Sequence, residues 1–468
     1  MADERLALTA HLLRRAGFGS TREELEAYAA RPYEEVVEEL IHPERMPDLD
    51  EDLLRRYYPH LGANQDNPNS WNGRWVWRMV NTKRPLEEKM ALFWHHVLAT
   101  GWTKSEHTPT MVEHVEMLRR DGLGNFRKIL VELSKDPAMI YWLDNNENHA
   151  RSINENYGRE ILELFSMGIG NYTETDIKNV ARAFTGWTFE QPIPLYPYGH
   201  YSSHFVYKPE DHDDSEKTFL GHTGRFNGED IIDIICRQEA TARFVSRHLY
   251  NFFVADEPQV PSWSVEPPRD PAAIDTLVKA FLDSDADIRS VMRVLFNSDF
   301  FKASRFQRVK SPIELVAGIV KLAGTHRDVE PGLVFFDGAT RVMGQTLMDP
   351  PTVEGWHTGK EWIDGGTLTE RVNFAVSQVS DVKKPGPQAI VSRLAALGTP
   401  LSPEALVDTI LDLVGPLEVQ PETRQALIDL AAKDGEATFD TEDARQKSEE
   451  RIGRLLRLTV ASREYQFA

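Results

Sequence analysis

A dense group of polar residues lies between positions 144 and 163 of the sequence. Within it, Asn156, Glu160 and Glu163 recur at helical spacing, roughly 100° around a helix from an apolar stripe that starts at Tyr157. The two carboxylates are therefore expected to project together at the edge of the core. Because like charges at i, i+3 repel each other, this placement predicts a partner: a metal ion, an arginine or a histidine.

A histidine pair on another expected helix, over residues 86–100, could supply that partner. His95 lies seven residues after Glu88, and His96 follows directly. Helical proteins assemble metal sites from histidines and carboxylates of different helices, although neither of the usual helical zinc or di-iron motifs is present here. We predict a polar site in which Arg159 or Arg182 orients the carboxylates and a divalent metal ion is the candidate cofactor. Its members are His95, Asn156, Glu160 and Glu163, and the metal ligands would be His95, Glu160 and Glu163.

In such a site, a carboxylate or a histidine would act as general base on a water molecule, which makes hydrolysis the default reaction. Two alternatives stay open. Glu160 and Glu163 could instead belong to a structural ion-pair network with Arg159 or Arg182. The chain could also be a non-catalytic helical scaffold that binds a partner protein through two tryptophan-bearing segments, Trp71–Trp77 and Trp356–Trp362.

Composition excludes several other functions. The 468 residues include 53 Lys and Arg against 73 Asp and Glu, a formal charge of −20, which argues against binding nucleic acid or anionic lipid. No apolar run approaches the roughly 18 to 20 residues that span a membrane. The single cysteine, Cys236, excludes a disulfide framework and is expected to be a buried, inert thiol. The sequence shows no signal-peptide pattern, which predicts a cytoplasmic protein.

Helical periodicity dominates the chain and predicts a mainly α, multi-helical globular protein. A β-hairpin is expected within about 187–221, with 203–207 as one arm, and a charged linker over 433–450. Residues 332–366 are rich in glycine and proline and are expected to form a long loop. Residues 43–81 are expected to form packed turns or a lid.

A capping box from Ser152 to Glu155 would start a helix near Ile153. We divide the chain into a main domain, 1–375, and a helical C-terminal lobe, 376–468. Helices are expected over 86–100, 111–120, 126–134, 154–167, 176–184, 228–236, 240–253, 272–282, 288–297 and 312–323.

Several segments in this order resemble a large, mostly bacterial family filed as domain of unknown function number eighteen hundred. They are His11–Gly19, Phe93–His96, Asn154–Glu160, Asp176–Trp187, His212–Gly221, Thr241–Phe244 and Met343–Trp356. The resemblance implies no established activity. It implies that the main domain and the C-terminal lobe form one inherited unit. It also suggests, as a partner, a protein of a second family that is similar to alkaline phosphatases and sulfatases. Many relatives are exported, whereas this sequence lacks an export signal, and Val97 replaces the second histidine that the family usually carries two positions after the first.

Overall fold

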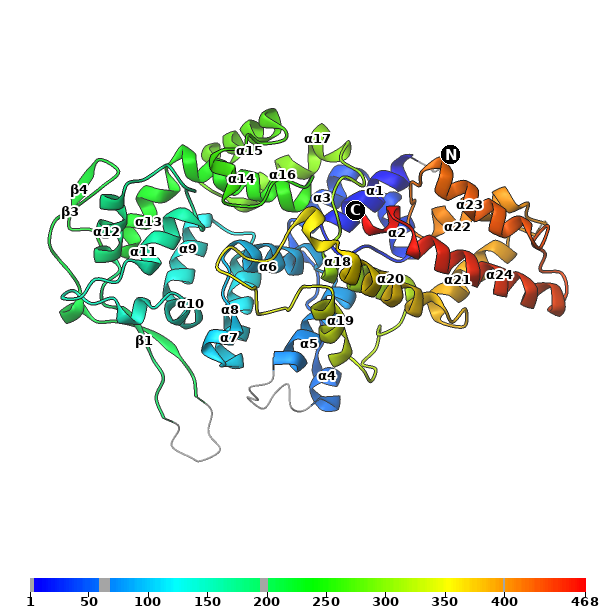
Figure 1. Cartoon of the computed structure of the whole chain (residues 1–468), viewed down its shortest axis with the longest axis horizontal. Helices are drawn as coiled ribbons and strands as arrows, with labels where there is room; N and C mark the ends of the chain where they lie inside the picture. Colours follow the sequence, from blue (N-terminus) through cyan, green and yellow to red (C-terminus); the bar gives the residue numbers. More distant parts are fainter. Residues whose placement is uncertain (1–3, 59–67, 194–200, 399) are drawn as a thin grey trace.

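The computed structural model describes residues 4–58, 68–193, 201–398 and 400–468, and it confirms a mainly α protein (Figure 1). Two small antiparallel hairpins, β1–β2 and β3–β4, accompany the helices in the described part of the chain. The strands are β1 (Trp187–Glu190), β2 (His204–Tyr207), β3 (Lys217–Phe219) and β4 (His222–Gly224). The helices are α1 (Glu4–Arg15), α2 (Arg22–Ala29), α3 (Tyr33–Leu40), α4 (Asp52–Tyr57), α5 (Pro68–Asn81), α6 (Pro85–Val97), α7 (Trp102–Ser105), α8 (Thr108–Asp121), α9 (Phe126–Lys135), α10 (Pro137–Trp142), α11 (Asn156–Glu163), α12 (Glu174–Ala183), α13 (Gly228–Cys236), α14 (Glu239–Phe253), α15 (Pro271–Asp283), α16 (Ile288–Asn297), α17 (Asp299–Lys302), α18 (Pro312–Ala323), α19 (Val334–Val342), α20 (Gly365–Val379), α21 (Pro385–Ala395), α22 (Pro403–Leu413), α23 (Pro421–Ala432) and α24 (Glu442–Ala461).

The molecule is elongated, and α6 and α18 lie near its middle (Figure 1). Helices α9 to α13 and the hairpins gather at one end, and α21 to α24 at the other. A continuous hydrophobic core runs through the molecule and includes Leu12, Phe93, Phe253 and Val316. The predicted domain boundary at 375/376 falls inside α20, which packs against both α18 and α24.

Local sequence signals explain where many of these helices begin. Ser311 and Glu314 form a reciprocal capping box at the start of α18, and Thr173 and Asp176 form one at the start of α12. Proline occupies the first turn of α6, where its missing N–H breaks no helical hydrogen bond. The ten helices expected from periodicity are all present, and nine of them have bounds within a few residues of the expected ones.

Four local predictions were wrong. Residues 43–81 hold the helices α4 and α5 rather than turns, apart from 59–67, which lie outside the described residues. The expected loop 332–366 contains α19, and the expected linker 433–450 contains the start of α24. The expected hairpin, by contrast, is present as β1–β2, and its second strand, His204–Tyr207, is the arm expected at 203–207. Residues 194–200 of this region lie outside the described residues, and a further hairpin, β3–β4, follows it. The helix with the candidate carboxylates begins at Asn156, and its N-cap residue, Glu155, makes no side-chain capping bond.

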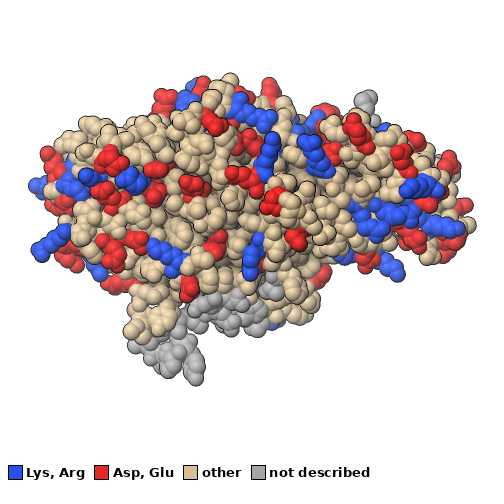
Figure 2. All heavy atoms as spheres, in the orientation of Figure 1, with Lys and Arg blue, Asp and Glu red and all other residues tan. Residues whose placement is uncertain are grey.

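Charged side chains of both signs are interspersed over the face of the molecule shown in Figure 2. Among the described residues, none of the helices has the length and apolar character needed to cross a bilayer. Burial raises the pKa of the Cys236 thiol to about 12, which agrees with the inert thiol expected from its apolar surroundings.

Candidate functional site

Helix α11 places the two candidate carboxylates at the edge of the core, as its spacing predicts. Tyr157 and Ile161 on the apolar stripe are buried, with exposures of 2% and 0%, whereas Glu160 and Glu163 are half-buried. Gly158 allows α11 to pack closely on α12, because a Cβ at this position would lie 2.9 Å from the backbone nitrogen of Ala181. The position of α11, which carries the two carboxylates, is therefore fixed by a tight helix contact.

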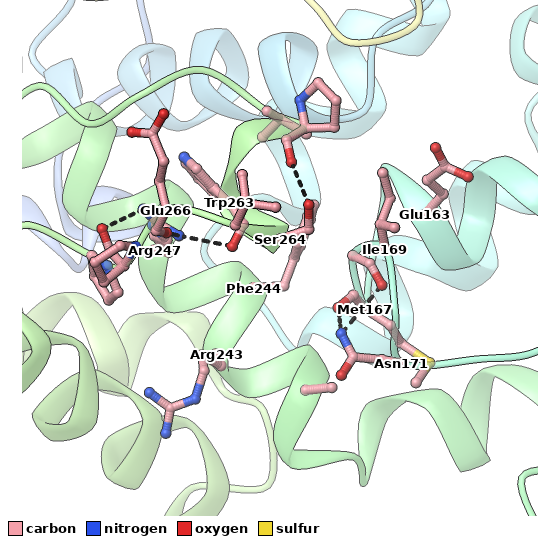
Figure 3. A pocket seen from close by; sticks show the side chains of 17 residues that line it. Glu163, Met167, Ile169, Asn171, Arg243, Phe244, Arg247, Trp263, Ser264 and Glu266 are labelled. Carbon is pink, nitrogen blue, oxygen red and sulfur yellow. Dashed lines mark hydrogen bonds between the residues drawn. The ribbon is translucent and has the colours of Figure 1, made fainter.

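A cavity of about 450 Å³ opens beside α11 (Figure 3). One wall comes from the end of α11 and the turn that follows it, with Glu163, Met167 and Ile169. The opposite wall comes from α14 and the segment 260–268, with Arg247 and Trp263. Its volume lies in the range of small-molecule binding sites.

The wall opposite α11 is held by a buried ion pair. Arg247 binds the Glu257 carboxylate at 2.7 Å and donates to the carbonyl oxygens of Glu266 and Pro267 at 3.0 and 3.1 Å. Its guanidinium also lies 4.6 Å from the centre of the Trp263 ring. The tryptophan face is therefore positioned before any ligand binds.

Within the described part of the chain, the two carboxylates form no ion pair with a cationic side chain. Among the described residues, neither Glu160 nor Glu163 forms an ion pair, and Glu163 accepts a hydrogen bond from the Tyr172 hydroxyl at 2.9 Å. Burial and the neighbouring charge of Glu163 raise the pKa of Glu160 to about 7; the positive charge of Arg159 opposes this shift, and Glu354 adds to it. Glu160 can therefore gain and lose a proton near neutral pH.

Three other residues of the predicted site bind partners other than the two carboxylates in the described structure. They are Arg159, Arg182 and Asn156. Arg159 binds Glu174 at 2.9 Å on the surface, and Arg182 binds Asp213 at 2.7 Å. In the described structure, therefore, no ion pair supports the alternative in which Glu160 and Glu163 belong to a network with Arg159 or Arg182. Asn156 donates to the Leu143 carbonyl at 3.1 Å, a contact that anchors the start of α11.

His95 lies apart from the cavity wall. It is fully buried among the rings of Trp356, His114 and Trp75, at centroid distances of 5.2, 5.3 and 6.0 Å. Burial, together with the neighbouring His114 and His96, holds its pKa well below the usual range. The turn that carries Trp356 also carries Glu354, so this turn lies close to both His95 and Glu160.

Among the described residues, no three or more His, Cys, Asp or Glu side chains are grouped so that they could hold a metal ion. The set of His95, Glu160 and Glu163 is thus not assembled as a three-ligand site, and the metal ion stays a prediction from sequence. The cavity walls also contain residues that sequence reasoning missed. Arg247 and Trp263 belong to α14 and the segment that follows it, and only the tertiary fold brings them opposite α11.

The raised pKa of Glu160 affects the stability of the fold. Ionised Glu160 destabilises the folded protein, because its folded pKa of about 7 exceeds the value of 4.5 for an ordinary glutamate. The folded state holds a proton that the unfolded state releases between those two values, so this destabilisation is present above pH 7 and is relieved as the pH falls toward 4.5. After allowance for solvent screening, E160Q should raise the free energy of unfolding by about 1–2 kcal/mol near pH 8, and much less near pH 5. Urea unfolding at both pH values measures this.

E210Q, on an exposed turn, is the matched control and should change stability by less than about 0.5 kcal/mol at either pH. A gain for E160Q of the same size at both pH values, or a loss near pH 8, would contradict the assignment of the shifted pKa.

The fold and the site together define a mainly α protein with a cavity lined by Glu163, one of two neighbouring carboxylates that form no ion pair among the described residues. The chain matches the family model described as protein of unknown function (DUF1800) over residues 11–467, and it belongs to that family. Comparisons with curated proteins and with solved structures found no match.

Proposed function

We propose that this protein is a hydrolase in which Glu160 acts as general acid and base beside Glu163. The observation that carries the proposal is a pair of carboxylates without ion-pair partners in the described chain: Glu160 has a pKa raised to about 7, and Glu163, one helical turn further along α11, lines a cavity of about 450 Å³. A structural carboxylate would ordinarily be paired with an arginine or fully solvated, whereas a pKa near the working pH suits proton transfer.

Each wall of the cavity has a chemical role in this proposal. Glu160 would remove a proton from an attacking water or give one to the leaving group, and Glu163, held by Tyr172, maintains the raised pKa of Glu160. Across the cavity, Trp263 offers an aromatic face for an apolar or sugar surface.

The test is a comparison of hydrolysis by the wild type and by E160Q, with 4-nitrophenyl esters, glycosides and phosphates as substrates. We expect E160Q to lower kcat/KM by about 100-fold or more, the usual contribution of a general acid or base. The wild-type pH profile should contain a limb near pH 7 that E160Q removes.

E210Q should retain activity within about twofold, because its side chain is exposed on a turn that is not part of the cavity wall. Equal rates for wild type and E160Q would contradict the role of Glu160, and absence of hydrolysis of every substrate class would contradict the proposed reaction. A cytoplasmic location and a divalent metal cofactor stay predictions from sequence.

The scaffold alternative depends on tryptophans that would contact a partner. Trp75, Trp77, Trp356 and Trp362 are instead buried, with exposures of 2–4%, and pack within the core. Trp71 is half-buried on α5 beneath the guanidinium of Arg74. These segments therefore offer a partner protein little aromatic surface, which favours the hydrolase proposal.

A further inference from the structure

A second group of charged residues, four of them buried and two half-buried, lies where α1, α6, α18 and α20 meet residues 465–468, apart from the α11 cavity. We call it the cationic cluster, and its members are Arg14, Arg15, Lys89, Arg308, Lys310 and Arg371. Among the described residues, two side-chain carboxylates face these six cations: Glu314, and Asp256 with its Oδ1 3.9 Å from Arg308 Nε. This interior therefore carries excess positive charge in a protein whose net charge is −20.

The distribution of ion pairs leaves three members of the cationic cluster uncompensated. Glu314 binds Arg15, Lys89 and Arg308. In the described part of the chain, Arg14, Lys310 and Arg371 have no carboxylate within ion-pair distance; Glu418, which lies near Arg14, is paired with Arg305. Removing unpaired charges from water is unfavourable, so a counter-ion here would stabilise the fold.

Arg14 and Lys310 line a small cavity of about 70 Å³, and both have hydrogen-bond donors that are not used. Arg14 donates from Nη1 to the Gly415 carbonyl at 2.8 Å, but its buried Nε has no partner among the described residues. Lys310 donates to the Tyr465 carbonyl at 2.7 Å and lies 4.1 Å from the centre of the Tyr465 ring, which leaves two N–H groups without a hydrogen-bond acceptor among the described residues. Behind it, Arg371 is fully buried, and its Nη1 also has no partner in the described structure.

We propose that this cavity binds a small anion, a carboxylate or a phosphate group, through Arg14 and Lys310. A guanidinium beside an ammonium is suited to the oxygens of such groups, because both make charge-assisted hydrogen bonds to them. The small volume selects an inorganic anion or a short-chain acid. Glu314 also lines the cavity, but its carboxylate is bound by Arg15, Lys89 and Arg308. The last residue, Ala468, is part of the lining too, and the other walls are largely apolar, with Phe18, Leu25, Phe306 and Leu417.

The electrostatics of Lys310 agree with this assignment. Burial, and then the positive charges of Arg14 and Arg371, lower the pKa of Lys310 to about 7. The nearby carboxylate of Glu314 opposes the shift only weakly, since three other cations surround it. A bound anion would supply the missing negative charge.

The experiment is thermal unfolding of the full chain in sodium chloride, inorganic phosphate or butyrate at matched ionic strength. For the wild type, we expect phosphate or butyrate to raise Tm by about 2 °C or more over chloride. Isothermal calorimetry with the same probe should show saturable binding, with Kd raised at least about tenfold in K310M and in R14Q. The control K433M, at an exposed lysine, should respond as the wild type does.

A response to phosphate alone identifies a phosphate site, and a response to butyrate alone identifies a carboxylate site. No response to either probe, or equal binding by wild type, K310M and R14Q, would overturn the proposal. Because each variant removes an excess cation, each should fold; if one of them does not, the other still gives the comparison. The E160Q variant leaves this cavity intact and should bind the anion as the wild type does, so the outcome is independent of the proposed hydrolase.

Discussion

Replacing Glu314 with glutamine should destabilise the protein by about 3–5 kcal/mol, a cost typical of removing one partner from a buried charge network. Its carboxylate binds Arg308 at 2.6 Å and Arg15 at 3.3 Å, and it also binds Lys89. Although burial alone would raise the pKa of Glu314, these three cations hold it well below the usual range, so the side chain is ionised at every working pH. Glutamine would leave three buried cations without compensation. The measurement is urea unfolding near neutral pH.

Replacing a cation of the same network should have a much smaller effect. Lys89 is fully buried, and burial lowers its pKa to about 7, so its charge is the least stable of the three around Glu314. K89M should cost about 1 kcal/mol or less, mainly for the lost hydrogen bond to the Gly17 carbonyl at 2.9 Å. The control E34Q, on an exposed face of α3, should change stability by less than about 0.5 kcal/mol.

The contrast between the two variants is the test. If E314Q and K89M lower the free energy of unfolding by the same amount, the charges of this cluster are balanced. The argument for an excess of cations then fails. If E314Q fails to fold while K89M folds normally, the asymmetry is confirmed in its extreme form.

Much of the helical architecture is predictable because its signals are local. Proline in the first turn, side-chain caps and apolar spacing specify α6, α12 and α18 without reference to the rest of the chain. The placement of Glu160 and Glu163 at a core edge is predictable for the same reason, since both lie on one short helix.

What the sequence does not predict depends on contacts between distant segments. Residues 332–366 are rich in glycine and proline, yet α19 forms there because Leu333 and Phe336 are buried and α19 packs against α5. Arg247 and Trp263 face α11 only through the packing of α14, about which the local pattern of α11 carries no information. The burial of His95 could not be predicted for the same reason. Its helical spacing indicates a residue of a polar site, whereas three rings from other parts of the chain surround it in the folded protein.

Replacing Gly355 with alanine should destabilise the protein by at least about 3 kcal/mol, because two unfavourable effects combine. The backbone at Gly355 has φ +93°, which side chains with a Cβ rarely adopt. A Cβ there would also lie 2.2 Å from the His96 carbonyl oxygen and 2.6 Å from its Nδ1, so the turn must move away from α6. That movement would break the hydrogen bond from the Trp356 backbone N–H to His96 Nδ1, which is 3.1 Å long.

Gly338 is the matched control, since it lies within α19, has open space within 4 Å of the position that a Cβ would occupy and does not need a positive φ. Alanine is the better helix former, so G338A should stabilise the protein by up to about 1 kcal/mol. Thermal and urea unfolding of the two glycine-to-alanine variants should therefore give shifts of opposite sign. If G355A costs less than about 1 kcal/mol, the turn that joins Trp356 to Glu354 is not fixed against α6. Glu354, whose charge adds to the raised pKa of Glu160, would then not be held in place by the contact of this turn with α6.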